Sequence, residues 1–215
     1  MQQVSATRSE LLARRAQIAL AVQGRELLKE KRSALMREFN RLGISVMEAM
    51  QALEKGATDA ARVLSDVVAA HGPESVHSAA FAAEGEVELE LISRSVAGVP
   101  IVEIEKTAVA RPRTGRGYSL AATSARIDAS AESFEALLDA LLEVAALELS
   151  LRRLADEINR TTRRVNALEH VVVPRLEAER AAIALVLEER ELEGRIRLLR
   201  ARSKAETNEN GRRAA

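Results

Sequence analysis

The chain has 215 residues, of which 30% are charged and only 2% aromatic, and it contains neither Cys nor Trp. This composition is typical of long helices and coiled coils, and the lack of Cys excludes disulfides and thiolate metal sites. The 32 Lys and Arg residues balance the 32 Asp and Glu residues, which argues against a dedicated binder of nucleic acid or anionic membranes. The N-terminus shows no signal-peptide pattern, and no uncharged apolar run is long enough to span a membrane.

Residues 1–70 form the first predicted segment, a long helix that starts near residue 4 and for which Gly56 is the candidate for an internal break. Ser5 or Thr7 can cap its N-terminus, and Glu10 follows Thr7 by three residues, as in a capping box. Apolar residues recur at helical spacing along the segment, for example Leu35 and Leu42. We expect the helix to end at His71-Gly72-Pro73, because glycine and proline terminate helices.

Residues 71–129 form a second region, in which the apolar period changes to two. Leu89 and Leu91 alternate with glutamates, and a second β-branched run begins at Ile101. A turn that contains Gly98 separates the runs, so we predict a β-hairpin over about 86–106. The Arg- and Gly-rich stretch 111–118 that follows is a loop by composition.

Residues 130–205 form the third segment, a helix too long for an ordinary globular domain. Pro174 should distort this helix locally rather than end it, because the apolar pattern resumes at Leu176. Beyond residue 205 the chain turns polar, and we predict that residues 206–215 form a disordered tail.

The two long helices can bury their apolar stripes only against each other, as an antiparallel pair. The expected fold class is therefore mainly α: a long antiparallel two-helix coiled coil with a small tip domain that contains the β-hairpin. A fold about residue 104 would place residue i opposite residue 208 − i, within two turns. Lys29, Lys31 and Arg32 would then lie near Glu177 and Glu179.

Apolar residues also recur in steps of 11 along the C-terminal helix. They are Leu154, Val165, Leu176, Leu187 and Leu198. A repeat of this length gives about 3.67 residues per turn, and it favours a straight or slightly right-handed helix pair over a left-handed supercoil.

No catalytic, cofactor or metal site is expected. The chain lacks a GxxxxGK[ST] phosphate loop, and its three His residues do not have metal-ligand spacing. The Gly115-Arg116-Gly117 loop could touch a phosphate, but a solvated connector is the favoured interpretation. A two-helix rod would also offer no pocket in which paired carboxylates could act as acid and base.

Two sequence blocks resemble a known family. The first comprises Thr7-Arg8, Leu11-Leu12 and the run GRELLKEKRSAL that starts at Gly24; the second is TTRRVNALE, which starts at Thr161, followed by VPRL from Val173. Together they resemble the D subunit of V-type and archaeal-type ATPases and ATP synthases, the central rotor shaft. The departures are small: Ala6 stands where the family often has Pro, and Ser33 where it often has Asp.

The resemblance implies a non-catalytic rotor subunit. It would transmit torque between the membrane ion-translocating ring and the catalytic hexamer, coupling ATP synthesis or hydrolysis to transport of protons or sodium. Its partners would be the A and B subunits of the hexamer, the F subunit on the flank of the shaft, and a C/d-type funnel subunit at the hairpin end. The subunit would be cytoplasmic and peripheral to the cell membrane, without membrane insertion or nucleic-acid binding.

The resemblance also assigns a partner interface, which consists of Thr7, Arg8, Lys29, Lys31, Arg32, Arg163, Arg164, Asn166 and Glu169. Asn166, beside the seam residue Val165, could instead fix the register of the coiled coil.

Two other functions remain open from the residues alone. A stand-alone coiled-coil scaffold or adaptor predicts a stable homodimer and no hexameric partner. A helical hairpin that binds nucleic acid through Arg111 to Arg116 predicts salt-dependent binding, although the neutral net charge and the scarcity of aromatic residues disfavour it.

Overall fold

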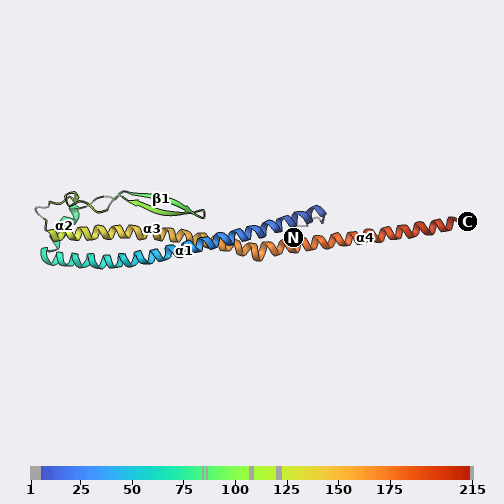
Figure 1. Ribbon diagram of the computed structural model, residues 1–215, viewed down its shortest axis with the longest axis horizontal. Helices are drawn as coiled ribbons and strands as arrows, with labels where there is room; N and C mark the ends of the chain where they lie inside the picture. The colour runs from blue at the N-terminus through green and yellow to red at the C-terminus, as the bar shows by residue number, and fades with distance from the viewer. Residues whose placement is uncertain (1–5, 84, 86, 107–108, 120–122, 214–215) are drawn as a thin grey trace. The chain divides into compact units, whose positions relative to one another are not determined.

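The computed structural model describes residues 6–83, 85, 87–106, 109–119 and 123–213, and its fold is mainly helical with one small β-hairpin, as predicted (Figure 1). The elements in chain order are α1 (Arg8–His71), α2 (Pro73–Ala82), β1 (Leu89–Val96), β2 (Val99–Lys106), the 3-10 turn η1 (Arg113–Gly115), α3 (Ala125–Ala167), the π-turn η2 (Leu168–Val172) and α4 (Val173–Arg213). The chain divides into two compact units: a first unit of Met1–Glu30 with Thr161–Ala215, and a second unit of Lys31–Arg160.

The ends of α1 follow the local signals in the sequence. The Thr7 hydroxyl accepts a hydrogen bond from the Glu10 N–H at 3.2 Å, which satisfies one of the free donors at the start of the helix. At the other end Gly72 has φ of +77°, and Pro73 opens α2. The Thr7 cap and the helix end at Gly72-Pro73 are therefore confirmed, and the alternative cap Ser5 lies outside the described residues. The break expected at Gly56 is wrong, because α1 runs uninterrupted to His71, and α2 is an element that the sequence pattern does not predict.

In the second unit, α1 and α3 lie side by side and the hairpin packs against them. Leu35 and Leu42 of α1, Leu154 of α3, and Val99 and Ile101 of β2 form one hydrophobic cluster. Leu35 and Leu154 are fully buried. Because Val99 and Ile101 lie close to the hairpin turn, that turn lies alongside the helices, well before α1 ends at His71.

The hairpin register follows from its two-residue turn. Ala97 and Gly98 both have positive φ, at 50° and 82°, which is the conformation of a type I′ turn. Val96 pairs with Val99 beside the turn, and Ser95 pairs with Pro100 next. In an antiparallel ladder bonded and non-bonded pairs alternate, so Pro100, which has no N–H, occupies a position that does not donate to β1.

The register predicted for the two helices is wrong. In the first unit Arg14 pairs with Glu179, and in the second unit a Cβ placed on Gly56 would lie 3.7 Å from Leu137 Cδ1. A sum of 208 would instead put residue 29 opposite Glu179. The reason is that α1 ends at His71 and α3 begins at Ala125, so the chain folds back about residue 98 and not about residue 104.

In the first unit the helix continues past Pro174, as predicted. Pro174 cannot donate a backbone hydrogen bond, and the chain accommodates it with the π-turn η2, in which the Val173 N–H bonds to the Leu168 carbonyl. The helix then runs to Arg213, further than the end predicted at residue 205. No helix among the residues described is both long enough and apolar enough to cross a membrane.

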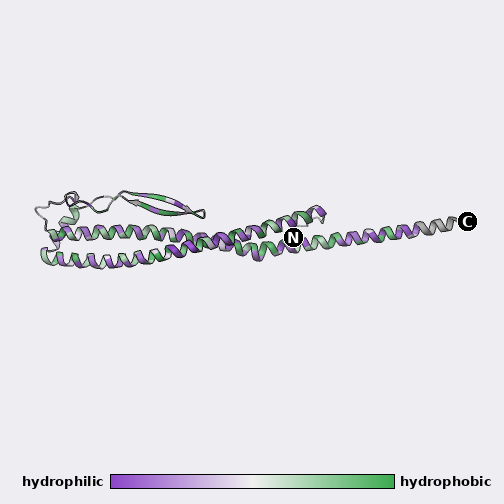
Figure 2. Cartoon of the chain, in the orientation of Figure 1, coloured by the Kyte–Doolittle hydropathy of each residue, from purple (hydrophilic) through white to green (hydrophobic). Residues whose placement is uncertain are grey.

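The 11-residue stripe is buried over most of its length. Leu154, Val165 and Leu176 are buried and Leu187 is half-buried, but Leu198 is 73% exposed. Arg8, the first residue of α1, pairs with Glu191 of α4. Because α1 begins at this level, it does not extend far enough along α4 to cover Leu198. Figure 2 shows how hydrophobic and hydrophilic residues alternate along each helix, as expected for helices that bury one side only.

Candidate functional site

Charged residues cross the helix seam of the first unit at three levels. Arg8 Nη2 lies 2.6 Å from Glu191 Oε1, Arg14 Nε lies 3.1 Å from Glu179 Oε2, and Lys29 Nζ lies 3.2 Å from Glu169 Oε1. The hydrogen bond from Lys29 lowers the pKa of Glu169, and the nearby charge of Arg25 acts in the same direction. Lys29 therefore pairs with Glu169 and not with the predicted Glu177 or Glu179, and Glu179 pairs with Arg14 instead.

Several residues of the predicted partner interface point outward from the first unit. Arg163, Arg164 and Asn166 are exposed on either side of Val165, which is 1% exposed in the seam. An exposed Asn166 cannot fix the register of the coiled coil, so that interpretation is wrong. Asn166 therefore lies on the surface of the first unit, where the partner-interface prediction requires it to be.

The other predicted interface residues have separate places. Thr7 caps α1 and Arg8 carries the exposed pair with Glu191. Lys31 belongs to the second unit and binds Glu157 at 2.7 Å, and Arg32 is half-buried. Of the nine residues, the structure joins Lys29 and Glu169 directly in one ion pair.

A buried ionic cluster in the second unit centres on Arg116. This side chain is only 4% exposed, and it binds both carboxylate oxygens of Glu135, at 2.9 and 2.8 Å, as well as Asp128. The Tyr118 hydroxyl donates to Asp128 at 2.9 Å, and Arg113 binds the other oxygen of Asp128 at 2.7 Å. The interpretation of residues 115–117 as a solvated connector is therefore wrong, because Arg116 ties this loop to α3.

The cluster holds its two carboxyl groups in the ionised form. The hydrogen bonds from Arg116 lower the pKa of Glu135 despite partial burial. Burial alone would raise the pKa of Asp128, but hydrogen bonds from Tyr118 and Arg116 outweigh it and the net shift is downward. Burial and the bond to Asp128 raise the pKa of Tyr118. Neither carboxyl is suited to donate a proton near neutral pH, so the cluster has the properties of a structural clamp.

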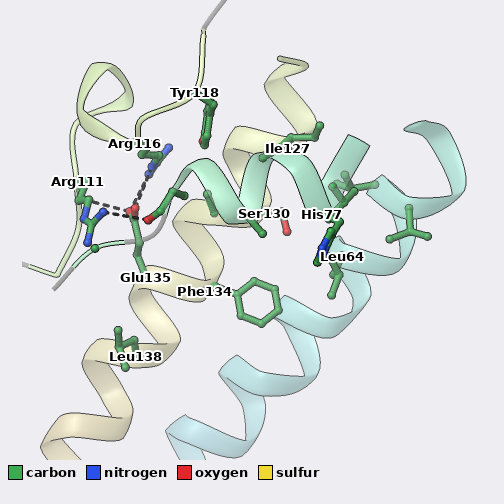
Figure 3. A pocket seen from close by; sticks show the side chains of 18 of the residues that line it. Leu64, His77, Arg111, Arg116, Tyr118, Ile127, Ser130, Phe134, Glu135 and Leu138 are labelled. Carbon is green, nitrogen blue, oxygen red and sulfur yellow. Dashed lines mark hydrogen bonds and ion pairs between the residues drawn. The ribbon is translucent and has the colours of Figure 1, made fainter. Parts of the chain in front are cut away.

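Beside this cluster lies a cavity of about 980 Å³, which the expectation of a pocket-free rod did not foresee. Figure 3 shows Arg111, Arg116 and Glu135 on one side and Leu64, His77 and Phe134 on another. The walls come from the end of α1, from α2, and from the start of α3, with apolar side chains such as Val67 and Ile127 in the majority. Within the described ranges, no group of three His, Cys, Asp or Glu residues is placed to hold a metal ion.

The sequence contains one signal for the clamp. Asp128 and Glu135 are seven residues apart in α3, so two turns of helix place both on the same face. Such a pair of carboxylates needs cations when it is buried, and the arginine-rich stretch 111–116 precedes α3. Ser150 of α3, which is fully buried and bonds to the backbone of Val102 in β2, gives no comparable signal, because one Ser within a helical pattern is usually exposed.

The fold and these sites define a class: a paired-helix protein whose ion pairs bind its own helices and loops together. A family model described as the ATP synthase D subunit matches residues 10–203. The A-type ATP synthase D subunit of Methanosarcina acetivorans is 36% identical over 94% of this chain and 97% of its own length. The corresponding protein of Archaeoglobus fulgidus is 37% identical over 95% and 98%, and that of Thermococcus kodakarensis is 36% identical over 93% and 94%.

The chain therefore belongs to the family of ATP synthase D subunits, and it is a component of an ATP synthase. The matched range covers all predicted interface residues except Thr7 and Arg8, which precede it.

Proposed function

We propose that this subunit is the central rotor shaft of the complex and performs no catalysis itself. It transmits torque between the membrane ion-translocating ring and the catalytic hexamer of A and B subunits, and it thereby couples ATP synthesis or hydrolysis to transport of protons or sodium. The F subunit binds its flank, and a C/d-type funnel subunit binds the hairpin end, where α2 and the base of the hairpin lie. The assembled subunit is cytoplasmic and peripheral to the membrane.

The seam of the first unit supports this proposal most directly. Buried apolar residues, including Val165, Leu176 and Ile183, fill the contact between the helices. The ion pairs of Arg8, Arg14 and Lys29 cross the same seam at successive levels. Sliding or twisting one helix against the other would break these contacts together, and a shaft that carries torque needs such resistance.

The outer surface of the first unit suits a moving contact. Arg163, Arg164 and Asn166 are exposed polar residues, and an exposed ion pair contributes only about 0 to 1 kcal/mol. Contacts of that strength can break and form again with a new partner at each step of rotation. Large aromatic anchors, which would hold one partner tightly, are rare in a chain with 2% aromatic residues.

The experiment is co-purification of the tagged chain from cells that also express the A and B subunits, followed by mass spectrometry and an ATPase assay. We expect recovery of A and B subunits with the full-length chain. Deletion of residues 1–20 removes the ion pairs of Arg8 and Arg14, and we expect it to abolish coupled ATPase activity. The replacement Arg62→Glu, at an exposed site of α1, is the control and should have no effect. Recovery of the chain without A and B subunits would contradict the proposal.

A further inference from the structure

The two edges of the β-hairpin have different surroundings. The edge of β2 is covered by α3: Ser150 exchanges two hydrogen bonds with the backbone of Val102, and Arg153 Nη1 donates to the Pro100 carbonyl at 3.3 Å. Val102 is only 6% exposed. The helix therefore occupies the side on which β2 could have paired with another strand.

The edge of β1 is open. Residues 89–95 are all exposed, including the apolar Leu91 at 67% and Ile92 at 42%. In the hairpin register Leu91, Ser93 and Ser95 face Ile104, Val102 and Pro100 at the non-bonded positions, so their backbone N–H and C=O groups point away from β2. No hydrogen bond to these backbone groups occurs within the described part of the chain. An exposed edge with apolar side chains is a template for a further strand.

The charged side chains of β1 determine which strand can pair with its open edge. Glu90, Ile92 and Arg94 lie on the same face of the strand. The negative charge of Glu90 lies two residues before Ile92, and the positive charge of Arg94 lies two residues after it. Neither charged side chain makes an ion pair within the described residues, although the charge of Arg94 contributes to lowering the pKa of Glu38, whose carboxylate binds Arg41. An antiparallel partner must therefore offer an acid opposite Arg94, an apolar residue opposite Ile92 and a base opposite Glu90.

The sequence of β1 itself has this order of side chains. We propose that β1 pairs antiparallel with β1 of a second copy of the chain about a twofold axis at Ile92, forming a four-stranded sheet. Glu90 of each copy then faces Arg94 of the other, and the two Ile92 side chains meet. The same register places Leu91 opposite Ser93, so the outward backbone groups of both strands form hydrogen-bonded pairs.

The pairing concerns the free chain before it joins the ATP synthase. It covers an edge that would otherwise recruit unrelated strands, and it is weak enough to be displaced, because one pair of strand edges buries much less than a standard interface of about 1,600 Å². A monomeric free chain would refute the pairing and leave the rotor function untouched. An extended segment of another protein with the same acid–apolar–base order is the rival occupant.

Sedimentation equilibrium of the full chain over a range of concentrations tests the proposal. We expect a reversible dimer for the natural chain, and a loss of dimer affinity of about tenfold or more for Glu90→Arg or Arg94→Glu alone, because each change places like charges opposite each other. Mixing the two variants in equal amounts should restore a heterodimer, and the double variant Glu90→Arg/Arg94→Glu should restore the homodimer. Restoration also shows that the variants fold.

The control is Glu48→Arg, an exposed charge reversal on α1, which should leave the dimer unchanged. The proposal is overturned if the natural chain stays monomeric throughout the range, if the single variants dimerise as well as the natural chain, or if neither mixing nor the double variant restores the dimer. It is also overturned if a peptide with the acid–apolar–base order binds β1 while the chain itself stays monomeric.

Discussion

The hydroxyl of Ser150 holds the backbone of Val102 by two hydrogen bonds. It accepts one from the Val102 N–H at 2.9 Å and donates one to the Val102 carbonyl at 3.0 Å. Ser150 is fully buried in α3, so no solvent competes for these bonds. Together with Val99 and Ile101 in the core, this contact fixes the hairpin along the helices of the second unit.

Replacing Ser150 with Ala should release this attachment. The Val102 N–H and carbonyl would stay buried without partners, and we expect the free energy of unfolding to fall by about 2 kcal/mol. Hydrogen exchange should show faster exchange at Val102, and urea denaturation should give the loss of stability. Ser65→Ala is the control, because Ser65 is exposed and bonds only to a carbonyl of its own helix. Equal stability of the two variants would show that the bonds of Ser150 do not hold the hairpin.

The clamp around Arg116 should be the most sensitive ionic site of the second unit. The change Arg116→Met leaves Asp128 and Glu135 without their main cation, and breaking a buried pair in this way costs about 3 to 5 kcal/mol. Urea denaturation measures this difference. Arg113→Met removes a cation that also binds Asp128 but is 68% exposed, so it should cost less than about 1 kcal/mol. A similar loss for both variants would argue against the central role of Arg116.

The same clamp predicts an acid dependence of stability. The pKa values of Glu135 and Asp128 are lower in the folded protein than their usual values. The unfolded chain therefore binds more protons than the folded chain in the acidic range, and the free energy of unfolding should fall as the pH drops below about 5. Thermal unfolding from pH 7 to pH 3 measures this slope. In Arg116→Met the slope should be smaller; an unchanged slope would place its origin in other carboxylates.

Lys29 and Glu169 provide a test of the helix register. In Lys29→Met the pKa of Glu169 should rise towards its usual value, because the hydrogen bond from Lys29 is the main cause of its lowering. Carbon-detected NMR titration of the glutamate carboxyl groups would show the shift. In the control Lys31→Met, which removes the partner of Glu157, the pKa of Glu169 should not change. A shift of Glu177 or Glu179 instead would support the register predicted from the sequence.

The helices and the hairpin could be predicted from the sequence because their signals are local. Thr7 caps one helix, Gly72-Pro73 ends it, and the alternation before Gly98 marks the strands. Local signals do not say how a connecting segment folds back on the helices that it joins. The predicted register folded the chain about residue 104, whereas the end of α1 at His71 and the start of α3 at Ala125 fold it about residue 98.

The clamp and the hairpin attachment could not be predicted because both depend on contacts between distant segments. Arg116 lies between two glycines in a loop, a pattern that usually means exposure, yet α3 supplies two carboxylates that bury it. The predicted interface residues are a mixed case. Lys29 and Glu169 meet each other, whereas Arg163 and Arg164 are exposed, as a surface that contacts partners requires.

Rotation of this subunit within the assembled complex tests the rotor function most directly. The chain contains no Cys, so Ser95→Cys, on the exposed strand β1, introduces a single attachment point for a bead or a polarised fluorophore. With the catalytic hexamer fixed to a surface, we predict unidirectional stepwise rotation of the probe when ATP is added, and none with a non-hydrolysable analogue. A probe that stays fixed relative to the hexamer while ATP is hydrolysed would contradict the account.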